Sequence, residues 1–210
     1  MRRRPLLVGA LVAIVGAALI LLWTQRGAEP VDGASTSSAT SSAAVSPTPA
    51  TATAEPPSGE APDPSGHVLR IPSIDLDADL HAEGLRDGKV NPPAQTVMWF
   101  EGMDRVAPGE VGTSVIAGHV VSGGGPDRFA DLAQVEVGDE VAIAQADGSS
   151  ATFTVVRAGV VDKDELTTDQ EVWGPNSSVR RLAIITCDDA YGFRDDGHRV
   201  ANYVVIAERT

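Results

Sequence analysis

The sequence predicts an all-β domain, folded as a sandwich or as a closed barrel. About eight short β-type runs follow one another between turn residues, which is the pattern of these two architectures. One pair of runs carries a hairpin signature, and helical periodicity is nearly absent. Residues 67–210 suit one domain with one core.

The predicted strands follow in chain order. The segment 138–161 contains two alternating runs joined by Asp147-Gly148, a dipeptide typical of tight hairpins. The run "RRLAIITC" does not alternate, so we expect a central strand covered on both faces. Only "DRFADLA" fits one or two helical turns, with Asp127 or a neighbour as the N-cap. The other expected strands lie within residues 67–80, 96–100, 113–121 and 200–209.

Residues 1–26 are expected to form a membrane anchor. Arg2, Arg3 and Arg4 precede an apolar run at residues 5–23, close to the length that crosses a bilayer. The arginines favour an N-terminus on the inner side, and Trp23 suits the outer interface. The alternative is a cleavable signal peptide, although its apolar region is usually shorter. As an anchor, the segment predicts a single-pass protein of the cell membrane with an extracellular domain.

Residues 27–66 are dense in Ser, Thr, Ala and Pro and nearly devoid of large apolar side chains. Such a segment cannot bury enough apolar area to offset the entropy of ordering it. We therefore expect a disordered linker between the anchor and the domain.

The domain is acidic. From residue 67 onward it carries 24 acidic and 12 basic side chains, a net charge near −12. This balance argues against nucleic acid or an anionic membrane as the ligand of the domain.

Cys187, at the end of "RLAIITC", is the only cysteine of the chain. It cannot form an intramolecular disulfide, so a nucleophilic role depends on a base that reaches it. His119 also ends an apolar run, "SVIAGH", and neighbouring strands would bring the two side chains to one rim of the sheet. His67 lies at the start of the domain, His81 in an expected polar loop and His198 in an expected exposed turn, so His119 is the candidate base.

Arg199 is the candidate electrostatic partner of Cys187, because a hairpin over "CDDAYGFRDDGHR" would return its guanidinium toward the sulfur. Arginine stays protonated and offers five donors, which suits an oxyanion or a substrate carbonyl. Arg194, inside the loop, is the competing candidate. Asp188 and Asp189 are expected to cap the loop or contact substrate.

The residue pattern predicts neither a metal site nor a cofactor. One cysteine and scattered histidines give no ligand spacing. "SGGGP" lacks the following Lys-Ser/Thr of a phosphate-binding loop.

Together these residues resemble a known family. "LAIITC" resembles the TLxTC signature of sortases, with Ala183 in place of the leading Thr, and "SVIAGHVVS" is similar to the histidine strand of these enzymes. The order His, Cys, Arg also agrees. "RIPSIDLDADLHAEGL", "VIAGHV" and "NYVVIAE" are especially similar to the class F sortases of actinobacteria.

The resemblance implies an eight-stranded β-barrel and a cysteine transpeptidase. Cys187 would attack an LPxTG-like sorting signal of a surface protein and form a thioacyl intermediate. An amine of the cell-wall precursor or of another protein would then accept the acyl group. His119 would act as general acid and base, and Arg199 would stabilise the oxyanion. Arg199 stands further from the last apolar run than the family pattern has it, which keeps Arg194 as an alternative.

Two other readings of the sequence remain. A membrane-tethered β-barrel binding module would carry the same anchor and a thiol without catalysis. A cysteine peptidase of another fold is the third, although such chains usually place Cys before His or carry other local signatures.

Overall fold

The computed structural model describes residues 59–195 and 197–209. The expected anchor and most of the expected linker lie outside these residues. Within the described part of the chain, no helix has the length and apolar character needed to span a membrane.

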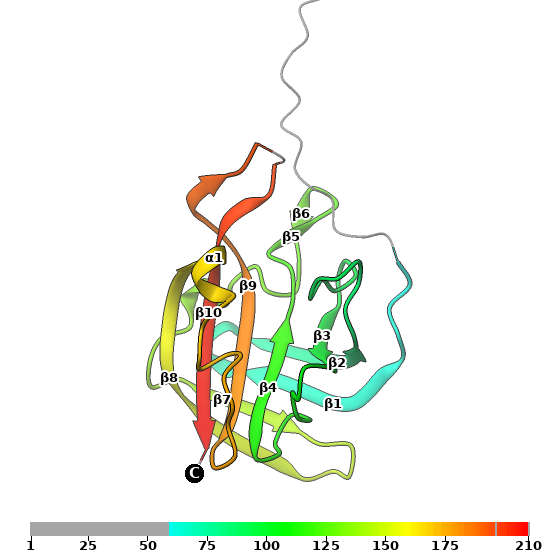
Figure 1. The fold of residues 1–210 in the computed structure, drawn as a ribbon. Helices are drawn as coiled ribbons and strands as arrows, with labels where there is room; N and C mark the ends of the chain where they lie inside the picture. The colour runs from blue at the N-terminus through cyan, green and yellow to red at the C-terminus, as the bar shows by residue number, and fades with distance from the viewer. Residues whose placement is uncertain (1–58, 196, 210) are drawn as a thin grey trace, which may run out of the picture. The chain divides into compact units, whose positions relative to one another are not determined.

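Eight strands close into a barrel in the order β1-β2-β3-β4-β9-β10-β8-β7 (Figure 1). This confirms the all-β prediction and selects the barrel over the sandwich. Its strands are β1 (Pro64–Ile71), β2 (Leu76–Glu83), β3 (Val97–Phe100), β4 (Gly112–Ala117), β7 (Glu140–Ala144), β8 (Ser150–Asp162), β9 (Arg180–Phe193) and β10 (Arg199–Arg209).

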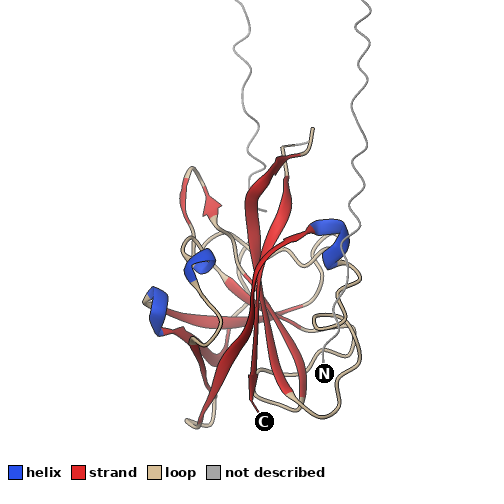
Figure 2. Ribbon diagram, turned by 90° about the vertical axis from the view of Figure 1, so that its left-hand side faces the viewer, coloured by secondary structure: helices blue, strands red, loops and turns tan. Residues whose placement is uncertain are grey.

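The helical content is small. The elements are the 3₁₀ turns η1 (Pro72–Ile74) and η2 (Leu132–Gln134) and one short helix, α1 (Lys163–Leu166). Figure 2 shows these elements, in blue, at the margins of the red strands. The helical turns expected over residues 127–133 are confirmed only in part: residues 128–131 form turns and the 3₁₀ turn η2 begins at Leu132. The expected cap is wrong, because the Asp127 carboxylate accepts hydrogen bonds from the backbone N–H groups of Gln95 and Arg128.

The hairpin expected at Asp147-Gly148 is confirmed. It joins β7 to β8, and Ala144 pairs with Ser150 across it. Gly148 has a φ of 84°, a left-handed conformation that glycine adopts without steric cost. The Asp147 carboxylate accepts a hydrogen bond from the backbone N–H of Ser149 at 2.8 Å, which fixes the turn.

The strand "RRLAIITC" is central, as its lack of alternation predicted. β9 lies between β4, to which it is parallel, and β10, to which it is antiparallel. Residues 182–186 are all buried. β9 continues past Cys187 to Phe193, so Cys187 lies within the strand and not at its end.

Two apolar clusters cover the two faces of β9. Leu182 and Ile184 point into the barrel, whose core takes side chains from all eight strands. Ala183 and Ile185 point outward into a second cluster, which contains Leu166 of α1. The segment after β8 therefore covers the outward face of β9. The candidate site lies between this segment and the strands.

Candidate active site

Cys187 lies on the outward face of β9, because side chains alternate along a strand and Ala183 and Ile185 point outward. It is partly buried and carries a free thiol. On the β10 side its partner in the sheet is Asn202. Shortly beyond Cys187 the pairing of β10 with β8 ends, and β9 and β10 continue as a two-stranded ribbon, drawn at the top of Figure 1.

His119 is brought to Cys187 by the register of two parallel strands. β4 pairs with β9 so that Ala117 faces Ile185, and the same register places residue 119 across from residue 187. Two hydrogen bonds hold this alignment past the end of β4. The Gly118 N–H donates to the Ile185 carbonyl at 3.3 Å, and the buried Thr186 hydroxyl donates to the Gly118 carbonyl at 2.8 Å.

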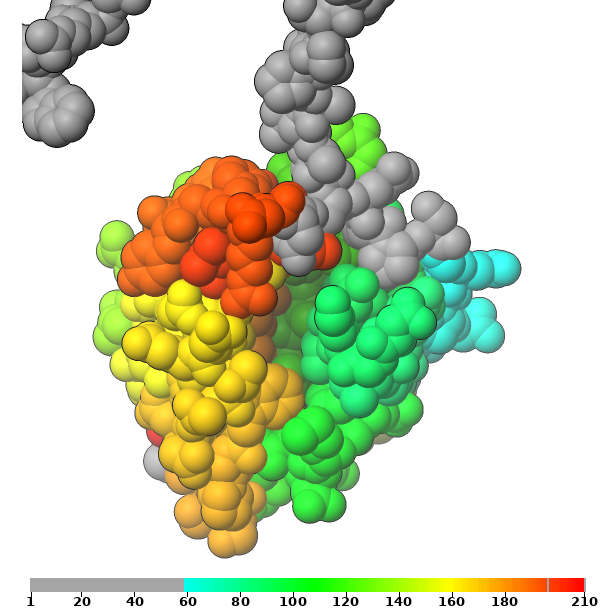
Figure 3. Space-filling model, turned by 45° about the horizontal axis from the view of Figure 1, so that its top comes forward, coloured from blue at the N-terminus to red at the C-terminus, as the bar shows by residue number. Residues whose placement is uncertain are grey.

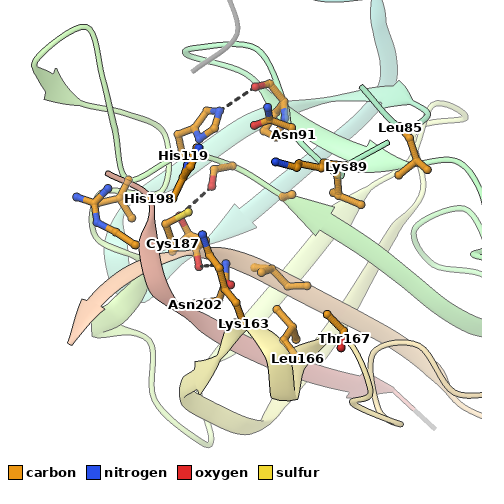
Figure 4. A pocket seen from close by; sticks show the side chains of 18 of the residues that line it. Leu85, Lys89, Asn91, His119, Lys163, Leu166, Thr167, Cys187, His198 and Asn202 are labelled. Atoms are coloured by element: carbon orange, nitrogen blue, oxygen red, sulfur yellow. Dashed lines mark hydrogen bonds between the residues drawn. The ribbon is translucent and has the colours of Figure 1, made fainter. Parts of the chain in front are cut away.

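The imidazole of His119 is oriented by the backbone of the β2–β3 connection. Its Nε2 lies 2.8 Å from the Pro92 carbonyl oxygen (Figure 4). A carbonyl can only accept, so Nε2 carries the hydrogen of this bond. Nδ1 is then the ring nitrogen left to exchange a proton with another group.

Gly118 and Phe129 fix the backbone of His119. A Cβ at position 118 would lie 2.7 Å from the Phe129 ring, so only glycine fits. Phe129 is fully buried, and its N–H donates to the His119 carbonyl at 2.9 Å. Glycine before the histidine is therefore a packing requirement.

Cys187 and His119 line one pocket of about 670 Å³. Figure 3 shows the surface hollowed between the segment after β2, in green, and the segment around α1, in yellow. Close to Cys187 the lining is polar, with His119, His198 and Asn202 (Figure 4). The rest is more apolar, and its side chains include Leu85, Val90, Met103, Leu166 and Trp173.

Both candidate arginines also line this pocket. The Arg199 guanidinium lies 5.5 Å from the centre of the Phe193 ring, its partner across the ribbon. Arg194 donates to the Asp164 carboxylate of α1 at 3.0 Å. Among the described residues no carboxylate forms an ion pair with Arg199, so Arg199 is the arginine whose charge is available to a ligand.

The β9–β10 ribbon is irregular next to Arg199. Ala201 pairs with Asp188, but Arg199 pairs with Phe193, so β9 contains extra residues at this point. Asp188 accepts a hydrogen bond from the Ala190 N–H at 2.7 Å, and Gly192 has a φ of 80°. The extra residues lengthen the ribbon above Cys187 while Arg199 still lines the pocket.

Of the other three histidines, two lie away from the pocket and one lines it. His67 lies in β1 against the Trp99 ring, with the ring centres 5.7 Å apart. His81 lies in β2, not in a loop, and its Nδ1 is 2.6 Å from the Pro62 carbonyl oxygen. His198 is exposed, as expected, but it also lines the pocket, so its position brings a second imidazole to the site.

The wall formed by the α1–β9 connection is anchored at several points. Trp173 donates to the Leu166 carbonyl at 2.8 Å and packs edge-on against Phe100. Asp169 is ion-paired with Arg157 on β8. Burial disfavours the charged carboxylate, but the hydrogen bond and positive charge of Arg157 outweigh it and lower the pKa of Asp169. The wall is therefore a defined surface for a ligand.

Sequence reasoning missed three residues of the site. Asn202 is buried, and its side-chain amide donates to the Thr186 carbonyl at 2.9 Å, next to the nucleophile. Lys89 and Lys163 line the pocket as well. The two lysines are the only ones in the sequence, and this rarity could have drawn attention to them. Nothing in the sequence indicated Asn202, whose place beside Cys187 follows from the pairing of β9 with β10.

No group of three or more His, Cys, Asp or Glu side chains that could hold a metal ion occurs in residues 59–195 and 197–209. The lining of the pocket instead supplies a thiol, imidazoles, a guanidinium and an apolar surface. This set suits nucleophilic attack on a carbonyl, with proton transfer and oxyanion stabilisation beside it.

The chain resembles known proteins over most of the described residues. A family model described as the sortase domain matches residues 69–210. A search of curated proteins found no match.

Among solved structures, sortase A of Listeria monocytogenes is similar at 18% identity and a TM-score of 0.51, over 70% of this chain and 87% of that one. Sortase A of Corynebacterium diphtheriae is similar at 20% identity and a TM-score of 0.53, over 72% and 62%. Sortase C-1 of Actinomyces oris is similar at 20% identity and a TM-score of 0.52, over 70% and 75%. At these identities the structures show a shared fold.

Proposed function

This chain belongs to the sortase family, and on that premise we propose that it cleaves an LPxTG-like sorting signal through a thioacyl intermediate on Cys187. The observation that carries the proposal is the placement of Cys187, His119 and Arg199 in the lining of one pocket. The apolar part of that pocket suits the Leu-Pro part of such a signal. The polar part suits the peptide bond that is cut.

In the first half of the reaction, the Cys187 thiol gives its proton to His119, and the sulfur bonds to the threonine carbonyl carbon of the signal. The oxygen of that carbonyl takes up negative charge, which the Arg199 guanidinium stabilises. The bond to the glycine nitrogen then breaks, and His119 delivers a proton to the departing amine. The products are a thioester on Cys187 and the released C-terminal fragment.

In the second half, an amine of the cell-wall precursor or of another protein attacks the thioester carbonyl. His119 accepts the proton of that amine and passes it to the sulfur as the carbon–sulfur bond breaks. A new amide joins the surface protein to the acceptor, and the Cys187 thiol is regenerated. No external oxidant or cofactor enters either half.

The proposed setting is the outer face of the cell membrane. Residues 1–26 would anchor the chain with its N-terminus inside. The expected linker, residues 27–66, would tether the domain outside up to the start of β1 at Pro64. The apolar run and its flanking arginines support this assignment. The similarity to class F sortases is part of the same proposal.

Intact-mass spectrometry of a trapped intermediate tests the proposed function. The wild-type domain, incubated with LPxTG-type peptides without an amine acceptor, should gain the mass of the peptide acylated through its threonine. Hydroxylamine should remove that mass, because it cleaves thioesters. Cys187→Ala should show neither the adduct nor turnover.

The controls separate this outcome from unfolding. Circular dichroism and thermal melting of Cys187→Ala should match the wild type, since the substitution removes only a partly buried sulfur. Full turnover by folded Cys187→Ala would reject the proposal. A wild-type domain that binds the peptides without an adduct or cleavage would favour the non-catalytic binding module.

A further inference from the structure

The chain contains only two lysines, and both line the pocket that holds Cys187. Lys89 lies in the β2–β3 connection, and Lys163 is the first residue of α1. They approach from different walls. In Figure 4 the Lys89 side chain lies between Leu85 and Cys187, and the Lys163 ammonium group points toward Cys187.

Local backbone contacts hold both lysines in place. The N–H and carbonyl of Lys89 are hydrogen-bonded to the carbonyl and N–H of Arg86, each at 2.9 Å, in a tight turn. Lys163 follows Asp162, whose carboxylate caps α1 by accepting from the Asp164 N–H at 2.7 Å. Hydrogen bonds therefore fix the backbone from which each lysine side chain extends.

No carboxylate within residues 59–195 and 197–209 forms an ion pair with either lysine. The acidic neighbours of Lys163 have other partners: Asp162 caps the helix, and Asp164 binds Arg194. Asp87 and Glu165, the next nearest in sequence, are exposed on the same two segments. Within the part of the chain that the structure describes, no ion pair therefore neutralises the charge of either lysine.

The pocket has a charge opposite to that of the domain. Among the described residues, its lining contains Lys89, Lys163, Arg194 and Arg199 and a single carboxylate, Asp164. The domain as a whole carries a net charge near −12. A basic lining inside an acidic protein creates a local positive potential, which favours an anionic group over a neutral one.

We propose that Lys89 and Lys163 make this enzyme selective for a peptide with an acidic side chain at the variable position of the sorting signal. This position precedes the threonine whose carbonyl Cys187 attacks, and it separates that carbonyl from the apolar Leu-Pro part. Lys89 occupies the corresponding interval, between Leu85 and Cys187 (Figure 4). The inference rests on the proposed transpeptidase function and names its substrate class.

Peptides that differ only at the variable position test the selection. With wild-type enzyme and one fixed amine acceptor, kcat/KM should be roughly five- to twenty-fold higher for Glu than for the isosteric Gln, because each partly exposed ion pair contributes up to about five-fold. The Lys peptide should be the poorest substrate. In 1 M salt the preference should shrink, since the screening length falls to about 3 Å.

Lysine variants assign the preference to the two side chains. Lys89→Gln and Lys163→Gln should each lower the ratio of kcat/KM for the Glu peptide to kcat/KM for the Gln peptide by up to about five-fold, because each removes one positive charge that faces the acidic side chain. The double variant should show a ratio near one. Lys89→Glu should prefer the Lys peptide to the Glu peptide.

Arg209→Gln is the matched control. It removes one positive charge from an exposed position at the end of β10, opposite Arg180 and outside the pocket lining. The Glu-to-Gln ratio of this variant should equal that of the wild type. A change as large as that of the lysine variants would assign the preference to net charge and overturn the proposal.

Failure of the selection and failure of the proposed function give different results. Equal kcat/KM for the Glu and Gln peptides, or a preference that survives in the double lysine variant, overturns the selection while turnover stands. Absence of turnover and of a Cys187 adduct with every peptide overturns the proposed function and the selection with it.

Discussion

His119 and Cys187 stand at matching positions of two adjacent strands, because the register that pairs Ala117 with Ile185 continues to them. The Thr186 hydroxyl and the Gly118 carbonyl secure this continuation with a buried hydrogen bond whose partners are 68 residues apart in sequence. His119 and Cys187 have the same separation. The spacing between the histidine motif and the cysteine motif is therefore the one that the register of the β4–β9 pair requires.

Substitution of His119 should stop both proton transfers. We expect His119→Ala to lower kcat/KM by about 10²–10⁴, the usual contribution of a positioned acid or base. Peptide cleavage and acyl transfer, measured separately, should both fall. His81→Gln is the control, because His81 lies in β2 and is not among the pocket residues; an equal loss in this variant would contradict the assignment.

The two arginines should differ in their effect. Arg199→Ala should lower kcat/KM by about 10²–10³, the range for loss of one oxyanion donor. Arg194→Ala should lose less than about ten-fold, because its guanidinium is engaged by Asp164. Steady-state kinetics with one peptide compares them. Equal small losses, or a larger loss for Arg194→Ala, would reverse the assignment.

Thr186→Val should weaken the alignment of His119 with Cys187. The variant keeps the shape of the side chain but leaves the Gly118 carbonyl without its donor, at a cost of about 1–3 kcal/mol in the free energy of unfolding. Activity should fall while the thiol is still present. Urea unfolding and kcat measure the two effects. Thr154→Val, on the exposed face of β8, should change neither.

Gly118→Ala should disturb the site through packing. The new Cβ would lie 2.7 Å from the buried Phe129 ring, and such overpacking typically costs about 1–3 kcal/mol. Displacement of Phe129 also strains its hydrogen bond to the His119 carbonyl, so kcat should fall. Phe129→Leu in the same chain should restore part of both losses. If Gly118→Ala alone is neutral, the close contact does not constrain His119.

The Asp169–Arg157 pair should make the pocket wall sensitive to acid. The pKa of Asp169 is lowered in the folded protein, so the carboxylate stabilises the fold above its unfolded pKa of about 3.9. That contribution is lost as the pH falls through the folded value. Asp169→Asn should therefore lower the urea midpoint at pH 7, and its deficit should shrink as the pH falls below about 4.

An exposed ion pair provides the comparison for this test. Arg70 and Asp77 lie 2.8 Å apart, with half or more of each side chain exposed. Asp77→Asn should change the free energy of unfolding by at most about 1 kcal/mol at any of these pH values. A deficit of Asp169→Asn that does not depend on pH would show that ionisation of Asp169 is not its cause.

The sequence by itself determined the all-β class, the β7–β8 hairpin and the central position of β9, because each depends on local patterns of apolar and turn residues. It also identified Cys187 and His119 as the candidate pair, since both end apolar runs and match a known family. These signals are readable because strand alternation and turn chemistry act over a few residues.

Only the tertiary structure decided how the site is completed. The parallel register of β4 and β9 brings His119 to Cys187. Arg199 lines the same pocket although it lies further from the last apolar run than the family pattern has it. The ion pair of Arg194 with Asp164 also distinguishes the two candidate arginines, because it engages the guanidinium of Arg194 and not that of Arg199. Lys89, Lys163 and Cys187 likewise come from segments far apart in the chain, and only the fold brings them to one pocket. Register and long-range pairing result from the closure of the whole barrel, which no local stretch of sequence encodes.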